Sequence, residues 1–150
     1  ASVLGTSGYN RYEISNYARD GYECRHNLRY WLREDYVGLG AAAHSFLGGR
    51  RYCYDDIRAY MQGEPVASYA DPDTPTEAQD EYVMVGLRLE KGIDKAAFAA
   101  RFGRAFDEVY GERLAPYARA GFVQNSPERC HFTTKGFMVS NTILADILDF

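Results

Sequence analysis

The sequence lacks the features that mark membrane-spanning, secreted or disulfide-rich proteins. No apolar run approaches the ~20 residues that a membrane-spanning helix needs, and no signal-peptide pattern opens the chain. The three cysteines, Cys24, Cys53 and Cys130, are odd in number and widely spaced. This spacing argues against a disulfide framework and favours a reducing compartment. We therefore expect a cytoplasmic protein without a transmembrane segment.

Positive charge is also scarce. The formal net charge is −4, with eight Lys and Arg against ten Asp and Glu in residues 1–75 and nine against eleven in residues 76–150. A nucleic-acid binder usually concentrates positive charge, because it has to displace counterions from phosphates. With no basic block in either half, we expect no nucleic-acid partner.

No strong metal or hydrolase motif is present. Cys24 and His26 lie two residues apart and the other cysteines and histidines are scattered, so the spacing does not predict a structural zinc site. His44 and Ser45 are adjacent, but no aspartate stands in an identifiable triad arrangement with them. The chemistry is concentrated instead in one segment, residues 12–40, which is rich in Tyr, Arg and Gly and holds the only Trp.

The composition of the 150-residue chain changes once. Three prolines and a glycine cluster with acidic and hydroxyl residues over residues 62–75, a pattern typical of a linker. We therefore divide the chain into a first unit, residues 1–63, a linker, residues 64–74, and a second unit, residues 75–150.

The first unit combines short strands with short helices. Residues 12–15 alternate apolar and polar side chains and residues 36–40 form an apolar run ending in glycines, so both segments are predicted strands. Residues 25–33 are compatible with a short helix. A glycine pair inside residues 45–54 predicts a hairpin.

The second unit is predicted to be winged-helix-like. A capping box with a proline at residues 74–77 predicts a helix that runs to about residue 89. The remaining elements are predicted as helices at residues 94–103 and 105–119, a β-ribbon at 122–132 and a closing helix capped by Thr134. The third helix carries acidic residues that would repel DNA phosphates, which favours a structural or lid role.

A helix over residues 25–33 would gather groups suited to a metalloporphyrin. Residues three, four and seven apart are neighbours on one helix face, and this rule places together His26, Arg29, Tyr30 and Arg33. An imidazole nitrogen can ligate haem iron, guanidinium groups suit carboxylates such as propionates, and an aromatic ring can stack on the macrocycle.

A purely structural reading of the same segment stays open. Asn27 and Trp31 form the adjoining stripe of this helix, and His26 and Asn27 can equally brace a neighbouring strand while the aromatic residues pack. Gly38 and Gly40 would let a ligand approach a strand end closely, but a lone Gly-x-Gly also serves ordinary turns.

Two separated sets of motifs stand out in the chain. Residues 12–18 read Tyr-Glu-Ile-Ser-Asn-Tyr-Ala, residues 26–31 read His-Asn-x-x-Tyr-Trp, and residues 36–45 contain Tyr-x-Gly-x-Gly and Ala-His-Ser. Residues 132–136 read Phe-Thr-Thr-Lys-Gly. The first set resembles the oxygen-independent coproporphyrinogen III oxidase family of radical SAM proteins, the HemN/HemW family, and the second resembles the small C-terminal domain of the same family. The His-Asn-x-x-Tyr-Trp pattern is similar to the HemW branch rather than to the true oxidases.

The resemblance implies an α+β fold with two parts. The first is an α/β barrel remnant, which consists of the last strands and one helix of a partial radical SAM barrel. The second is a small winged-helix-like domain of the HemN C-terminal type. HemW-like proteins are thought to bind haem and hand it to client proteins. The implied haem or substrate contacts are His26, Asn27, Arg29, Tyr30, Trp31 and Arg33, with His26 as the residue that meets haem iron. Gly38 and Gly40 would lie near S-adenosylmethionine.

The Cys-x-x-x-Cys-x-x-Cys cluster motif of the family is absent from these 150 residues. The [4Fe–4S] cluster and S-adenosylmethionine are therefore expected only in the full-length protein, and this chain, which begins with Ala1, is expected to be a C-terminal fragment that is inactive alone. The radical chemistry would depend on this cluster, which is expected outside these 150 residues. The sequence therefore leaves open whether the parent protein is an enzyme.

Two other functions remain open at this point. The chain could belong to a true oxidase that decarboxylates the propionates of a porphyrinogen, or it could be a protein-interaction module with an exposed apolar patch on the helix at 75–89. Strands 12–15 and 36–40, without barrel neighbours, are expected to be exposed edges through which the chain dimerises.

Overall fold

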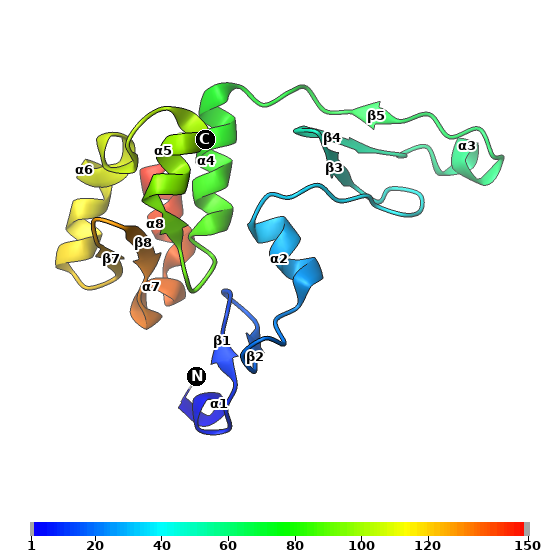
Figure 1. Cartoon of the computed structure of the whole chain (residues 1–150). Coiled ribbons are helices and arrows are strands. Elements are labelled where there is room, and N and C mark those ends of the chain that lie inside the picture. The colour runs from blue at the N-terminus through cyan, green and yellow to red at the C-terminus, as the bar shows by residue number, and fades with distance from the viewer. Residues whose placement is uncertain (1, 149–150) are drawn as a thin grey trace.

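The computed structural model describes residues 2–148 and shows two halves that differ in packing (Figure 1). The first half consists of short elements strung along an extended path. They are α1 (Ser2–Thr6), β1 (Asn10–Arg11), β2 (Tyr17–Ala18), α2 (Arg25–Trp31), β3 (Ser45–Leu47), β4 (Arg50–Cys53), α3 (Ile57–Met61) and β5 (Ser68–Tyr69).

The second half gathers helices around a small sheet. Its elements are α4 (Pro75–Gly86), β6 (Ile93–Asp94), α5 (Lys95–Phe102), α6 (Phe106–Arg119), β7 (Val123–Asn125), β8 (Arg129–Phe132), α7 (Thr134–Met138) and α8 (Ser140–Ile147). The antiparallel sheet has the order β6-β8-β7, with Ile93 opposite Cys130 and Val123 opposite Phe132. The chain is thus a mixed α and β structure. No helix of residues 2–148 is both long and apolar enough to cross a membrane.

The predicted hairpin at residues 45–54 is confirmed. Strands β3 and β4 pair antiparallel, and β5 adds to the other edge of β4 to complete a sheet of order β3-β4-β5. Gly48 and Gly49 make the turn with φ angles of 57° and 78°, a left-handed conformation that glycine adopts at little cost.

The predicted strands at residues 12–15 and 36–40 are wrong. Residues 12–16 form the turn between β1 and β2, in which the Tyr12 N–H donates to the Asn16 carbonyl at 3.2 Å. Each predicted strand contributes one isolated bridge, Glu13 with Leu89 and Tyr36 with Phe46. Neither segment therefore offers the free strand edge that was expected, although dimerisation itself stays a prediction.

Local capping signals set most helix boundaries in the second half. The capping box is confirmed, since the Glu77 N–H donates to Thr74 Oγ1 at 3.2 Å and the Thr74 N–H donates to Glu77 Oε2 at 2.7 Å. Asp94 accepts from the Ala97 N–H at 2.9 Å at the start of α5, which ends at a left-handed Gly103. These side chains satisfy backbone N–H groups that the first turn of a helix leaves unpaired.

Helices α4, α7 and α8 of the second half have boundaries that differ from the predicted ones. Helix α4 ends at Gly86 rather than at residue 89. The closing helix is divided at Val139 into α7 and α8, and its first cap is Thr133, whose Oγ1 accepts from the Gly136 N–H at 3.2 Å.

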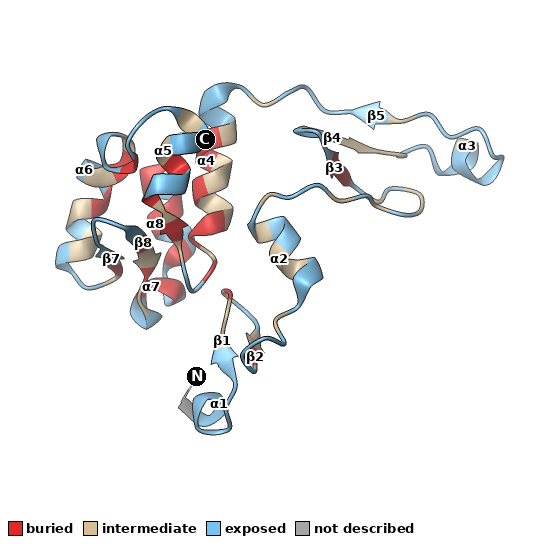
Figure 2. Ribbon diagram, in the orientation of Figure 1, coloured by how far each residue is buried: buried red, intermediate tan, exposed pale blue. Residues whose placement is uncertain are grey.

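One hydrophobic core lies in the second half. Figure 2 shows buried residues concentrated on α4, α5, α6, α8 and the sheet, whereas the first half is mostly exposed or half-buried. Phe98 is fully buried at the centre of an aromatic group, with its ring centroid 4.9 Å from that of Phe102 and 5.3 Å from that of Phe106. Burying rings of this size supplies much of the stabilising free energy of a small core, so the second half is the more firmly packed support.

Candidate functional site

Helix α2 brings His26 and Tyr30 together on one exposed face. The two residues are one turn apart, and the Tyr30 hydroxyl lies 2.9 Å from His26 Nε2 with the rings edge-on at 5.0 Å. This is the i, i+4 pairing expected for a helix. The predicted adjacency of His26 and Tyr30 is therefore confirmed.

An aromatic row continues from this pair into the β3–β4 hairpin. The Tyr30 ring stands 4.6 Å from the ring of Tyr36, which lies 6.3 Å from Phe46 on β3. Burial, and then the neighbouring Tyr30, raises the pKa of the Tyr36 hydroxyl, because both disfavour its anionic form. Tyr36 therefore stays neutral at physiological pH and serves as a flat, partly apolar wall.

An open hollow of about 320 Å³ lies beside this row. It is lined by His26, Arg29, Asp35, Tyr36, Val37 and Leu47. Arg29 lies at the edge of the hollow, where its Nη1 donates to the Asp35 carbonyl at 3.2 Å and its side chain is 54% exposed. The hollow thus combines an imidazole, an accessible guanidinium group and exposed apolar side chains.

Arg33 does not join the His26 face. Helix α2 ends at Trp31, and Arg33 follows it with φ 55°, so the seven-residue helical spacing no longer applies. Its side chain is only 7% exposed and binds the carboxylates of Asp73 and Glu81. The prediction of a shared face is wrong for Arg33.

Arg33 and three charged residues near it form what we call the junction cluster: Arg33, Arg51, Asp73 and Glu81. Arg51 on β4 also binds both carboxylates, with Nη1 2.9 Å from Asp73 Oδ1. The cluster joins the end of α2 and the hairpin to α4. It therefore fixes the helix that carries His26 relative to the second half.

Asn27 and Trp31 occupy other sides of α2. Asn27 Nδ2 lies 3.5 Å from the Tyr12 hydroxyl. The Trp31 ring lies below the guanidinium of Arg88, with 5.9 Å from Cζ to the ring centroid, a distance compatible with a cation–π contact. The structure thus groups His26, Arg29 and Tyr30, whereas Asn27, Trp31 and Arg33 contact other partners. Tyr30 and Arg33 still line one small pocket of about 150 Å³ together.

The two predicted cofactor glycines have different surroundings. A Cβ atom on Gly38 would lie 2.4 Å from the carbonyl oxygen of His44, and the Gly38 N–H donates to Ser45 Oγ at 2.9 Å. Gly40 adopts φ 106° in open space. Close packing of the chain explains the glycine at 38 and backbone conformation explains the one at 40, and a role for either in cofactor binding stays a prediction.

Asp35, Tyr36, Val37 and Leu47 line the hollow but were not predicted as site residues. Tyr36 stood inside the Tyr-x-Gly-x-Gly motif, so a signal for it was present. Leu47 reaches the hollow because Tyr36 and Phe46 exchange backbone hydrogen bonds at 2.7 and 2.9 Å. Spacing along the sequence gives no sign of that long-range bridge.

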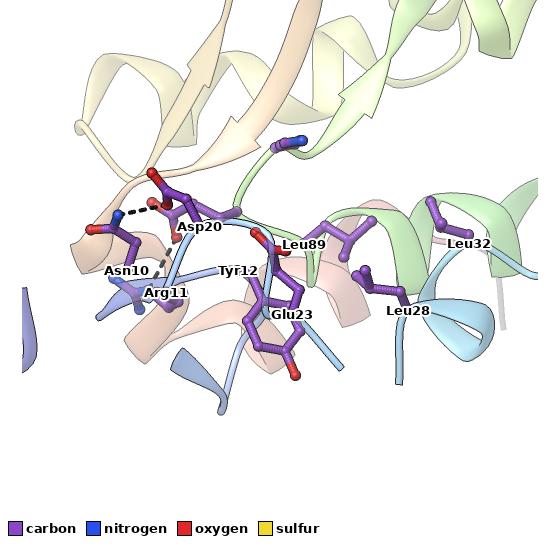
Figure 3. Close-up of a pocket in the computed structure, with 10 residues that line it drawn as sticks. Asn10, Arg11, Tyr12, Asp20, Glu23, Leu28, Leu32 and Leu89 are labelled. Atoms are coloured by element: carbon purple, nitrogen blue, oxygen red, sulfur yellow. Dashed lines mark hydrogen bonds and ion pairs between the residues drawn. The ribbon is translucent and has the colours of Figure 1, made fainter. Parts of the chain in front are cut away.

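A larger cavity of about 370 Å³ lies on the opposite side of α2 (Figure 3). Leu28 of α2 and Leu32, the residue after this helix, line it together with Leu89 and with the Arg11–Glu90 ion pair, whose atoms lie 3.1 Å apart. It holds no histidine. Within residues 2–148 no three His, Cys, Asp or Glu side chains are grouped to hold a metal ion. The hollow beside His26 is therefore the better candidate for a metalloporphyrin.

Comparison with known proteins finds a match to a family model in the second half of the chain. Residues 73–139 match the model of the HemN C-terminal domain. A solved structure shares the fold with a TM-score of 0.73 at 17% sequence identity. It is that of the coproporphyrinogen III oxidase HemN from Escherichia coli, described as a radical SAM enzyme, and the match covers 97% of this chain and 38% of that one. The resemblance to the HemN/HemW family that the motifs predicted is therefore confirmed.

Within this family, the curated relatives carry the name of heme chaperone HemW. The Lactococcus lactis protein is 31% identical over 97% of this chain and 39% of its own length. The Bacillus subtilis protein is 34% identical over 98% of this chain and 40% of its own length. The chain thus spans about two fifths of the length of these relatives.

Proposed function

We propose that this chain contributes the haem-contacting part of a HemW-like protein that binds haem and passes it to recipient proteins. The observation that carries the proposal is the exposed His26 imidazole beside a partly apolar hollow, in a chain whose relatives are named heme chaperones. The His26 imidazole supplies an axial nitrogen for haem iron, which is the cargo here.

The residues around His26 suit the other parts of the haem molecule. Val37 and Leu47 are 56% and 49% exposed, and with the Tyr36 ring they offer apolar surface to the macrocycle. Arg29 can pair with a propionate, because guanidinium groups bind carboxylates through two parallel hydrogen bonds. We assign Arg33 to support of α2 through the junction cluster, and Asn27 and Trp31 to the outer border of the site.

We further propose the architecture that the family resemblance implies. Residues 1–63 would complete a radical SAM barrel, residues 64–74 would link it to the second unit, and residues 75–150 would form a winged-helix-like domain. The [4Fe–4S] cluster and S-adenosylmethionine would be held by other parts of a longer cytoplasmic protein, with Gly38 and Gly40 near S-adenosylmethionine. Without those parts, this chain would be inactive as a radical enzyme.

A true coproporphyrinogen oxidase is the second candidate function, favoured by the fold shared with HemN. That reaction needs cationic partners for several substrate carboxylates. On the His26 face Arg29 is accessible, whereas Arg33 already binds two carboxylates. This charge distribution supports the haem carrier. The protein-interaction module lacks the patch it required, because the large apolar side chains of α4 are buried or half-buried.

Titration of the chain with hemin, followed by Soret absorbance, tests the proposal. We expect saturable binding that weakens at least tenfold in His26→Ala, because an iron–nitrogen bond is lost. His44→Ala is the matched control, since His44 is also exposed but does not line the hollow. Equal affinity of the wild-type chain and His26→Ala would refute the role of His26, provided that circular dichroism shows both folded.

A further inference from the structure

The Tyr30 hydroxyl occupies the nitrogen of His26 that iron would need. It lies 2.9 Å from Nε2, and within residues 2–148 no other hydrogen-bond partner of this imidazole is found. We infer that Tyr30 is a positioning residue that caps His26 in the haem-free protein and has to release it before iron binds. This inference rests on the proposed function.

Nε2 is the ring nitrogen that haem can reach. Nδ1 is bonded to the ring carbon that carries Cβ, so a macrocycle centred on an iron at Nδ1 would collide with the backbone of α2. Nε2 lies at the outer end of the ring, and His26 is exposed in the first turn of the helix. Haem therefore binds at the atom that Tyr30 already contacts.

Tyr30 competes with iron in either tautomer of the imidazole. If the hydroxyl donates to Nε2, it uses the lone pair that iron requires. If Nε2 carries the proton and donates it to the hydroxyl oxygen, that proton has to move before the nitrogen can ligate. In both cases the hydrogen bond between Tyr30 and His26 breaks when the iron–nitrogen bond forms.

The surrounding contacts determine which side chain moves. The Tyr30 ring packs edge-on against Tyr36 at 4.6 Å, and Tyr36 is tied to β3 through its bridge with Phe46. His26 has its ring contact with Tyr30 alone among these residues. The imidazole therefore swings toward the hollow while Tyr30 stays in place, and its ring remains available to the macrocycle.

Removing the hydroxyl should tighten haem binding. A hydrogen bond between neutral groups stabilises by about 0.5–1.5 kcal/mol net, which corresponds to a roughly two- to tenfold change in affinity. Tyr30→Phe keeps the ring and removes the competing hydroxyl. We expect this variant to bind hemin about two- to tenfold more tightly and to associate faster, with an unchanged position of the Soret band because the iron ligand is the same.

The experiment compares hemin affinity and association rate in the wild-type chain, Tyr30→Phe, His26→Ala and the double variant. Tyr22→Phe is the control, because Tyr22 is 82% exposed and outside the hollow. In the haem-free protein, the ring-nitrogen NMR shifts of His26 should change in Tyr30→Phe and stay the same in Tyr22→Phe. In the His26→Ala background, Tyr30→Phe should have no further effect.

Unchanged or weaker hemin binding by Tyr30→Phe, alongside a clear loss in His26→Ala, would overturn the cap and leave the proposed function intact. Binding that is insensitive to His26→Ala would overturn the proposed function itself. Unchanged His26 ring-nitrogen shifts in Tyr30→Phe would show that the hydrogen bond is absent in solution, and would likewise refute the cap.

Discussion

Replacing Arg33 with methionine should destabilise the chain by about 3 kcal/mol, because it removes the charge that binds two carboxylates. Methionine keeps most of the side-chain volume, so the loss should reflect the charge rather than a cavity. Arg33 is 7% exposed and binds both Asp73 and Glu81. Losing one partner of a buried ion pair costs about 3–5 kcal/mol. The lower end applies, since Asp73 and Glu81 are 19% and 23% exposed and Arg51 still binds both.

Urea unfolding measures this loss. Tryptophan fluorescence reports on α2, because Trp31 is the only tryptophan, and circular dichroism reports on the helices as a whole. With a denaturant slope of about 1–3 kcal/mol per M, the midpoint should fall by roughly 1–3 M. Arg29→Met is the matched control: its side chain is 54% exposed with its carboxylate partner 4.0 Å away, and such pairs contribute at most about 1 kcal/mol.

Equal unfolding curves for Arg33→Met and Arg29→Met would refute the reasoning. The junction cluster would then be no more important than a pair of surface charges. The hemin titration of Arg33→Met is a second test of whether the junction cluster holds α2 in place. If the cluster fixes α2, binding should weaken although Arg33 does not line the hollow.

Three further predictions concern groups outside the junction cluster. Burial opposes ionisation of Asp107, but hydrogen bonds from Lys95 and Asn125 outweigh it and lower the pKa of the carboxyl. Its stabilising effect should therefore be complete above the usual pKa of about 3.9 and disappear as the pH falls below it, and acid unfolding of Asp107→Asn should lack this component. Iodoacetamide at pH 8 should modify the exposed Cys24 and spare the buried Cys130, because burial raises the pKa of the Cys130 thiol to about 12. Peptide mass spectrometry can check this, and equal labelling of both cysteines would contradict the burial. Gly38→Ala should lower the melting temperature, because the new Cβ would approach a backbone carbonyl to 2.4 Å, whereas Gly5→Ala enters open space and should not; equal melting temperatures would contradict the close approach.

The elements that the sequence predicted well are those set by contacts within a few residues. The capping box at residues 74–77, the Asp94 cap and the glycine turn at 48–49 each act over three residues or fewer, so their signals are local. His26 and Tyr30 are likewise one helical turn apart. The family motif could be recognised for the same reason, since its residues are contiguous.

The elements that could not be predicted depend on distant partners. Residues 12–15 have a strand-like pattern, but their partner is Leu89 in the second half. Arg33 was placed on the wrong face because no glycine or proline marks the end of α2, and its partners lie 40 and 48 residues away. Spacing rules describe the geometry of one helix and give no information about the charges that another element brings to it.

The junction cluster connects the segments before and after residues 61–66 through side-chain ion pairs, in addition to the peptide backbone. Arg33 and Arg51 precede the exposed stretch at residues 61–66, and both of their carboxylate partners follow it. Strand β5 also follows this stretch and pairs back to β4. A chain cut at residues 63–66 would thus keep both the ion pairs and the strand pairing. The two pieces on either side of this cut could be produced as separate polypeptides and reassembled, and a higher salt concentration should weaken their association.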